Sequence, residues 1–468
     1  MLLRFVPKAT LAGCIVLACM TAATAGTADA RTRPHYGGVL RVEVDRDPLQ
    51  KPNGIAWRLM LDGLTRIDSD GVVRPSLAVR WESQDGDHRW QFWLRTGVSF
   101  QNGRPLNGLA VVTSLEESCR AAACPWTAVR VLGPSVVFTS DNPLPDLPSL
   151  LAENEFLIGL SSGTATEVNA STPGILGTGP FRIKDSNGNT IRLEANDDCW
   201  QGRSFVDAIE MDARRPMREQ WMDLSLGKAD LVEVHAGDIR QARQQRMNVV
   251  VSPPVTLLAL EVHNTELAPQ LRAALALAVD RAALYQVIFQ KQGEVTASLL
   301  PASLTGYSFL FSTDRDLNRA QALRGGVTPP PLTLAVDGSG AMQLAAERLA
   351  LNMHDAGFAV RVLTPAANGM LPHADLVLRA LPLAGGTPED ALDAMLRRLG
   401  LSAPAMTKDL AGTYKEERDF LDQHAVIPLL YLPRAWAISG RLRDLQLTGE
   451  GLPDLANVSL PSGNEVTP

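Results

Sequence analysis

Residues 75–117 read PSLAVRWESQDGDHRWQFWLRTGVSFQNGRPLNGLAVVTSLEE, and the rest of the fold is organised around them. Aromatic and polar side chains alternate over residues 88–95, which predicts a half-buried strand. The D-G and N-G dipeptides at residues 85–86 and 102–103 predict turns, because glycine adopts positive φ without steric cost. Apolar residues then recur at helical spacing over residues 109–115. The stretch therefore predicts two strands joined by a turn, a second turn and a helix.

The same stretch resembles the signature of the family 5 extracellular solute-binding proteins, the peptide- and nickel-binding receptors of ABC importers. That signature is roughly P-x-L-A-x-x-W, a D-G turn, an aromatic strand ending L-R-x-G-V-x-F, then x-N/D-G-x-P-L and a helix. The residues that match it in order and spacing are Pro75, Leu77, Ala78, Trp81, Asp85, Gly86, Leu94, Arg95, Gly97, Val98, Phe100, Gly103, Pro105 and Leu106.

Further blocks of the chain resemble the same family in the same order. They are GGVLRVEV at 37–44, GTGPFRI at 177–183, IRLEANDDCWQGRSFVDAI at 191–209, LRAALALAVDRAALYQVI at 271–288 and AVIPLLYL at 425–432. The block at 191–209 departs from the family pattern, because Cys199 replaces the usual Tyr and Phe205 lacks its usual preceding Pro. The connection after the first strand, Asp45 to Ile55, is also shorter than the family's. The resemblance covers about residues 36–460.

The resemblance implies an α/β, two-lobed periplasmic-binding-protein fold with a discontinuous first lobe and two hinge crossings. The crossings are expected at Leu257–Asn264 and Ile427–Leu432. The first lobe would comprise residues 31–258, with 431–468 returning to it, and the second lobe would comprise residues 259–430. Closure would then be a hinge motion that traps ligand between the lobes.

The first thirty residues predict a signal peptide. Arg4 and Lys8 precede a run of small and apolar residues, and two small-x-small cleavage sites follow at 23–25 and 28–30. The run is not apolar enough for a membrane span. A lipoprotein signal is the alternative, with a lipid anchor at Cys19, since Cys14 lies too close to the basic residues. Under either alternative, the mature protein is expected in the periplasm.

The remaining cysteines are Cys119, Cys124 and Cys199. In an exported protein an odd set suggests one disulfide and one free thiol. Cys119 and Cys124 are close enough to pair across a helix end, although spacing does not prove connectivity. Three scattered thiols supply too few ligands for a metal cluster.

Composition and motifs argue against an enzyme or a nucleic-acid-binding protein. The 468 residues carry 44 basic and 51 acidic side chains, a mildly acidic balance. The sequence contains no H-E-x-x-H or Walker motif, and its seven histidines are dispersed. The DGSG at 337–340 follows an expected strand and precedes an expected helix, so it predicts a turn with helix capping. We expect no catalytic residue, no cofactor and no bound metal.

Candidate ligand-binding residues come from loops at the expected edges of the lobes. They are Glu43, Asp45, Trp57, His263, Asn264, Glu389 and Asp390. For the first three the alternative is a solvated face, and for His263 it is a hydrogen-bonded structural histidine. Peptide receptors of the family carry a Trp and then an Asp that pairs with the peptide's free ammonium. Here Leu381 and the G-G-T at 385–387 stand in that region, which leaves Glu389 or Asp390 as substitutes and puts ordinary peptide binding in doubt.

The expected function is that of a substrate-binding protein of an ABC importer. It would capture an oligopeptide-like or other small solute between two lobes, as a monomer. It would deliver the solute to the permease and ATPase complex in the cytoplasmic membrane. The alternative is a non-transporting receptor, sensory or scaffold protein on the same fold, which the shortened first connection and the missing acidic loop favour.

Overall fold

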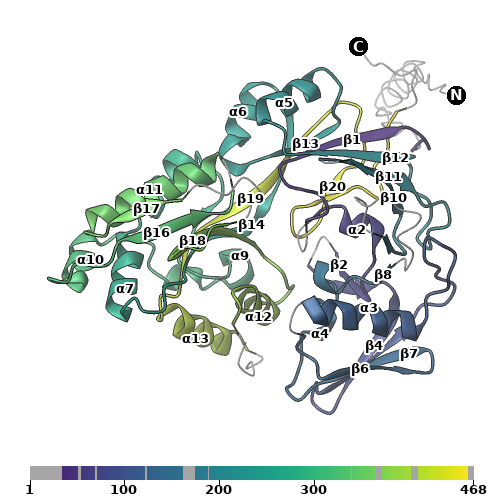
Figure 1. The fold of residues 1–468 in the computed structure, drawn as a ribbon, viewed down its shortest axis with the longest axis horizontal. Helices are drawn as coiled ribbons and strands as arrows, with labels where there is room; N and C mark the ends of the chain where they lie inside the picture. Colours follow the sequence, from purple (N-terminus) through teal and green to yellow (C-terminus); the bar gives the residue numbers. More distant parts are fainter. Residues whose placement is uncertain are drawn as a thin grey trace, which may run out of the picture.

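The computed structural model describes residues 34–50, 54–68, 71–121, 124–161, 174–187, 189–338, 340–363, 371–401 and 409–461. The predicted signal peptide, with Cys14 and Cys19, lies outside these residues. The chain folds into two lobes that share one large sheet (Figure 1).

The large sheet has eleven strands and runs through both lobes. Its strands are β1 (Val39–Val44), β10 (Phe181–Asn187), β11 (Thr190–Ala195), β12 (Ala208–Ala213), β13 (Leu231–Val234), β14 (Asn248–Val262), β15 (Glu294–Val295), β16 (Leu332–Val336), β17 (Val360–Val362), β18 (Leu376–Pro382) and β19 (Val426–Ile438). Their order is β10-β11-β12-β1-β13-β19-β14-β18-β16-β17, with β15 paired to β19. β1 is parallel to β12 and β13, and β16 is parallel to β17 and β18. The α/β two-lobed fold predicted from the sequence is confirmed.

Two long antiparallel strands, β14 and β19, carry the chain from one lobe to the other. Residues 435–438 of β19 pair with both β13 and the start of β14, whereas residues 256–262 of β14 pair with β18. Between these parts the ladder is irregular, and Pro254 lies opposite Pro433. Proline has no N–H to donate, so this point of the sheet has fewer inter-strand hydrogen bonds. The proline pair therefore lies at the irregular point of the sheet between the two lobes.

Both crossings predicted from the sequence fall on these strands, but each strand extends further than predicted. The first crossing was predicted to begin at Leu257, and β14 starts at Asn248 and continues through Pro253 and Pro254. The predicted lobe boundaries at 258/259 and 430/431 lie inside β14 and β19 and stay predictions.

The first lobe has its own core, to which the C-terminal segment returns. Leu40 and Ile209 of the sheet pack with Trp436, and Leu442 and Leu455 of the tail join the same cluster. Around this core lie α2 (Trp57–Met60), α5 (Met217–Ser225), α6 (Ile239–Gln244), β20 (Gln446–Leu447) and β21 (Pro453–Asp454).

A smaller sheet with its own apolar cluster is built from the stretch at residues 75–117 and the chain that follows. It has the order β4-β5-β7-β6, with α3 beside it. The elements of this region are β2 (Thr65–Ile67), β3 (Val73–Pro75), β4 (Ala78–Gln84), β5 (Arg89–Leu94), α3 (Gly108–Ala121), β6 (Ala128–Leu132), β7 (Ser135–Thr139), α4 (Leu147–Leu150), β8 (Leu160–Ser161) and β9 (Ile175–Leu176). Asp85 and Gly86 both have positive φ in the turn between β4 and β5. The predicted strand, turn and helix are confirmed.

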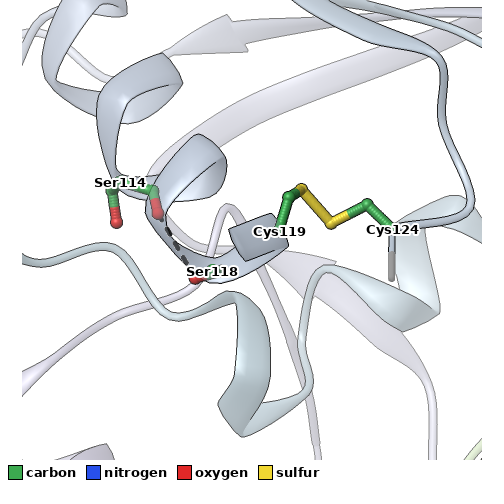
Figure 2. Close-up of a disulfide and its surroundings, with 4 residues drawn as sticks. All are labelled: Ser114, Ser118, Cys119 and Cys124. Carbon is green, nitrogen blue, oxygen red and sulfur yellow. Dashed lines mark hydrogen bonds between the residues drawn. A yellow bond between two sulfur atoms is a disulfide. The ribbon is translucent and has the colours of Figure 1, made fainter. Parts of the chain in front are cut away.

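The sulfur atoms of Cys119 and Cys124 form a disulfide at the C-terminal end of α3 (Figure 2). In the last turns of the helix, Ser118 Oγ donates to the backbone carbonyl of Ser114 at 3.3 Å. Cys199 is a buried free thiol. The pairing that the spacing allowed is therefore the one that forms.

The Gly-Thr-Gly block at residues 177–179 packs directly against α2. A Cβ atom on Gly177 would lie 1.9 Å from the carbonyl oxygen of Met60, and one on Gly179 would lie 2.7 Å from that of Leu59. Only glycine permits such a close approach of two backbones. The block is thus a packing motif of the first lobe.

The second lobe packs helices on the sheet formed by β14 to β18. They are α7 (Pro269–Ala278), α8 (Arg281–Ala283), α9 (Ala302–Thr305), α10 (Leu317–Arg324), α11 (Ala341–Asp355), α12 (Pro388–Arg398) and α13 (Leu410–Leu421). The block at 271–288 is not one helix: it breaks after Ala278, because Asp280 caps a new helix by accepting the N–H of Ala283, and a π-helical turn follows. Among the described residues, none of the helices has the length and apolarity needed to cross a bilayer.

A buried carboxylate joins α13 to the connection before α9. Glu417 accepts hydrogen bonds from Ser298 Oγ at 2.6 Å and from Tyr307 Oη at 2.7 Å. The backbone N–H groups of Leu299 and Leu300 also donate to it. Burial raises the pKa of Glu417, and these four donors act against that rise. We call this group the Glu417 cluster; all of its polar members are buried and partnered.

Candidate functional site

A cavity of about 200 Å³ lies where the two lobes meet beside the proline pair. The first lobe supplies the segment after β1, the segment after β13 and part of the tail. The second lobe supplies residues from β18, from the end of β16 and from the start of α11. Its lining residues are Val44, Asp45, Arg46, Asp47, Pro48, Gly54, Ile55, Glu233, Val234, His235, Ala236, Gly237, Thr256, Phe289, Asp337, Gly338, Ala341, Met342, Ala380, Pro382, Leu432, Pro433, Arg434, Ala435, Trp436 and Leu452. A chamber built from both lobes is the arrangement that a trapped solute requires.

An ion pair joins the two lobes at the cavity. Arg46, which follows β1, lies 3.1 Å from a carboxylate oxygen of Asp337, which follows β16. Both side chains line the cavity. The pair shows that the two lobes are in contact beside the cavity.

Two further contacts join the lobes away from the cavity. Arg397 of α12 donates to Asp146 at 2.8 Å and lies 3.7 Å from Glu153. Gly386 packs so tightly on Gly71 that a Cβ at residue 386 would lie 2.0 Å from the Gly71 carbonyl oxygen. The backbones of Gly386 and Gly71 thus form a contact between the lobes.

His235 forms a charged cluster in the cavity wall. Its Nε2 lies 3.4 Å from Asp45 and its Nδ1 lies 3.7 Å from Asp238. These two carboxylates raise the pKa of His235 to about 10, and the bond from His235 lowers the pKa of Asp45. The imidazole therefore carries a positive charge at neutral pH, and Asp45 is already engaged by it.

Arg434 is different, because no carboxylate of the described residues lies within ion-pair distance of it. It follows Pro433 on β19, and its backbone N–H donates to Ser252 Oγ at 3.0 Å. Within the described residues, no hydrogen bond or ion pair is made by its guanidinium group. Burial lowers the pKa of Arg434, with Glu233 and Glu450 acting in the opposite direction from beyond ion-pair distance. Arg434 lines the main cavity and also a smaller one beside it.

The rest of the cavity wall is largely apolar. Phe289, Met342 of α11 and Pro382 of β18 all line the cavity from the second lobe, and Phe289 is fully buried. Trp436 is buried too, and its Nε1 donates to the Gly451 carbonyl at 3.0 Å. An apolar wall with a few placed charges is the usual composition of a small-molecule site.

Of the residues predicted to bind ligand, Asp45 lines the cavity. Glu43, two positions earlier on β1, is 4% exposed and forms an ion pair with Arg215 at 2.8 Å. Burial raises the pKa of Glu43 to about 7, against the opposing charge of Arg215. Trp57 is buried in the first lobe, where its Nε1 donates to the Leu49 carbonyl at 3.2 Å. Neither Glu43 nor Trp57 is part of the lining.

His263 and Asn264 lie past the far end of β14, away from the cavity lining. His263 Nε2 is 2.7 Å from Glu261, and Asn264 Nδ2 donates to Asp375 at 2.9 Å. This is the hydrogen-bonded arrangement that was the alternative for His263. The predicted crossing at Leu257–Asn264 begins on β14 and stays a prediction.

Glu389 and Asp390 occupy the first turn of α12, outside the cavity lining. Thr387 caps this helix by accepting the N–H of Asp390 at 3.2 Å. Burial raises the pKa of Asp390 to about 6, with Asp146 adding to the rise. Both residues lie on the lobe that faces Asp146, near the contact made by Arg397. A ligand-binding role for these seven predicted residues stays a prediction.

The cavity also contains residues that sequence reasoning did not select. Arg434 and His235 each lie within or just after a strand, where alternation alone does not reveal which face is covered. The available signal was the Pro-Arg pair at 433–434 inside an otherwise apolar run. No group of three or more metal-ligating side chains is found in the described part of the chain.

Comparison with known proteins places the chain among bacterial solute-binding proteins. The sequence profile described as "Bacterial extracellular solute-binding proteins, family 5 Middle" matches residues 72–372. The chain is 26% identical over 239 residues to the nickel-binding protein NikA of Staphylococcus aureus, which covers 49% of this chain and 48% of that protein. It is 24% identical over 351 residues to a probable di/tripeptide-binding protein of Pseudomonas aeruginosa, covering 65% and 66%. These matches span less than two thirds of either relative.

Solved structures agree on the fold. DppA from Helicobacter pylori in complex with the peptide STSA has a TM-score of 0.78 at 17% identity, covering 92% of this chain and 99% of that one. AgaA from A. tumefacien R10, in complex with agropinic acid, has a TM-score of 0.76 at 17% identity, covering 91% of this chain and 99% of that one. The profile match and the shared two-lobed architecture lead to one conclusion: the chain belongs to the bacterial extracellular solute-binding proteins of family 5.

Proposed function

We propose that this protein captures a small solute between its lobes and delivers it to the permease and ATPase complex of an ABC importer. The observation that carries the proposal is a cavity lined from both lobes while those lobes touch through Arg46 and Asp337. A solute that contacts both lobes favours the closed form, and only such differential binding shifts the equilibrium. The permease would then recognise the closed form.

The size of the cavity supports a small solute. Its volume of about 200 Å³ is below the roughly 300–1,000 Å³ typical of sites for drug-sized ligands. Relatives of this chain are named for nickel and for di- and tripeptides, and the compared structures hold a tetrapeptide and agropinic acid. For this chain we favour a solute at the smaller end of that range.

The proposal includes no catalysis and no cofactor, because capture and release need neither. The family is extracellular, and we propose that this member acts in the periplasm as a monomer after export. Cleavage by the ordinary signal peptidase is preferred, with lipidation of Cys19 as the alternative.

A non-transporting receptor or sensory protein on the same fold is the second candidate. Two observations favour it: the short connection between Asp45 and Ile55, and the backbone contact of Gly386 with Gly71 in place of an acidic loop. Such a protein would still bind a solute but would not stimulate a transporter. Stimulation of a reconstituted permease and ATPase by the loaded protein therefore separates the two candidates.

The experiment that tests solute capture is thermal denaturation of residues 31–468 with a library of amino acids, short peptides, nickel–histidine and sugars. A solute at about 100 times its Kd should add roughly 2.7 kcal/mol to the free energy of unfolding. The Ala341→Phe variant, which fills the cavity from α11, should lose the response. Leu344→Phe, at a 53% exposed position of the same helix, should keep it. If no solute raises the melting temperature of the unmodified chain, the proposal fails.

A further inference from the structure

The strongest unexplained feature of the cavity is the guanidinium group of Arg434, for which the described residues supply no hydrogen bond or ion pair. A half-buried charge without such a partner is costly, because water is lost without a replacement interaction. Most arginines beside it are engaged: Arg46 pairs with Asp337, Arg58 pairs with Glu450 at 3.2 Å, and Arg398 donates to the Pro382 carbonyl. Arg434 is therefore the arginine of this group that is available to an anionic group of a solute.

The acidic groups of the cavity are already engaged. Asp45 faces the His235 imidazolium, Asp47 lies 3.6 Å from Arg214, and Asp337 faces Arg46. Glu233 accepts the backbone N–H of Asp45 at 3.2 Å and lies two residues from the charged His235. A ligand ammonium entering the cavity would therefore compete with these existing partners, whereas a ligand carboxylate would meet a guanidinium with all its donors available.

Guanidinium and carboxylate also match in shape. The planar group of arginine presents parallel N–H donors that fit both oxygens of a carboxylate. Arg434 is held by its backbone, since Pro433 fixes the preceding residue and the Arg434 N–H is bonded to Ser252 Oγ. The apolar side chains of Phe289 and Met342 lie across the same cavity and would cover the body of a solute.

We propose that Arg434 anchors a carboxylate of the captured solute, so that the cavity takes small carboxylates with an apolar body and does not need their ammonium group. This proposal rests on the proposed function, because it names the ligand class of the same cavity. The charged group of the solute that the protein recognises would then be its carboxylate.

The test uses leucine, methionine and phenylalanine, each in four forms: free, N-acetylated, carboxyl-amidated, and both acetylated and amidated. Binding to the purified chain is measured by calorimetry and by thermal denaturation. The N-acetylated acids should bind about as well as the free acids, and both amidated forms should bind at least about 30-fold more weakly, the loss expected for a hydrogen-bonded charge pair.

Three variants separate the role of Arg434 from a general effect of charge. Arg434→Met should weaken binding of the N-acetylated acids about 30- to 1,000-fold while leaving binding of the amides unchanged. The affinity of Arg434→Lys for the N-acetylated acids should lie between those of Arg434→Met and the unmodified chain. Lysine keeps the positive charge but lacks the parallel N–H donors that bind both carboxylate oxygens. Arg361→Met, at an exposed position of β17, should change nothing. Circular dichroism and melting temperature establish that each variant is folded.

The outcomes distinguish this proposal from the one it rests on. If amides or amines bind the unmodified chain and acids do not, or if Arg434→Met binds acids unchanged, the anchor is disproved while solute capture stands. If neither these compounds nor any member of the wider library binds, both proposals fail. Binding that tolerates acetylation, rejects amidation and requires Arg434 supports the anchor.

Discussion

The Glu417 cluster and the cavity at Arg434 both hold a charge away from bulk water, but they differ in the number of partners that the protein supplies to that charge. Glu417 is fully buried and receives hydrogen bonds from two side chains and two backbone N–H groups. Arg434 lines a cavity, and its guanidinium donates no hydrogen bond to the described residues. A charge with every partner supplied by the protein stabilises the fold, whereas a charge with none is available to something from outside. The difference between them separates a structural site from a binding site.

The largest expected effect on stability comes from removing the carboxylate of Glu417. Glu417→Leu leaves Ser298, Tyr307 and two backbone N–H groups buried without an acceptor, so we expect a loss of about 3–5 kcal/mol in the free energy of unfolding. Asp419→Asn, on the exposed side of the same helix, is the matched control and should have no measurable effect. Equilibrium denaturation in urea measures both. A loss no larger than that of the control would show that the cluster is not structural.

His235 provides an intermediate case, since two carboxylates share its charge. Its pKa in the folded protein is about 10, above the ordinary 6.5, so the folded state holds a proton that the unfolded state releases between these values. The resulting stability is fully present below pH 6.5 and is lost as the pH rises toward 10. His235→Gln should cost about 1–2 kcal/mol at pH 6 and progressively less at higher pH. Unfolding curves recorded from pH 6 to 10 that stay parallel for both proteins would contradict this assignment.

Removing the charge of Arg434 should have the opposite sign to removing that of Glu417. Arg434→Met replaces an uncompensated charge by an apolar side chain of similar length, so the free energy of unfolding should stay the same or rise by up to about 1 kcal/mol. Urea denaturation without added solute measures it. A loss of 3 kcal/mol or more would mean that Arg434 has structural partners after all.

The smallest expected effect is at the ion pair between the lobes. Arg46 and Asp337 are partly exposed, with side chains 45% and 33% accessible, so their coupling should be worth about 0–1 kcal/mol. A double-mutant cycle of Arg46→Ala and Asp337→Ala measures that energy, and small-angle scattering of the same proteins reports the population of open forms. Raised salt should reproduce the effect of either variant. A coupling energy well above this range would mean that the ion pair by itself holds the two lobes together.

The sequence was most informative where structure is local. The aromatic strand β5, the turn at Asp85 and Gly86, and α3 depend on alternation, turn chemistry and helical spacing within one short stretch, and each is present as predicted. The disulfide at the end of α3 is of the same kind, since its two cysteines are five residues apart. The lobed architecture required the family resemblance.

The site was harder to predict because it depends on pairing between distant strands. The run that contains Arg434 has the composition of a buried strand, and only its register with β13 and β14 places that arginine at the junction of the lobes. The sequence predicted a crossing at Leu257–Asn264, whereas β14 begins at Asn248 and continues through Pro253 and Pro254. The candidates His263 and Asn264 were chosen beyond the end of this strand, whereas the cavity lining includes Thr256, nearer its middle.

Both described ends of the chain belong to the first lobe: β1 opens it, and the tail after β19 packs into its core. A fluorophore pair placed at the two ends would consequently be insensitive to the motion between the lobes. For an optical sensor built on this protein, one dye belongs on that lobe and the other on the outer face of α11, where Leu351 is 59% exposed.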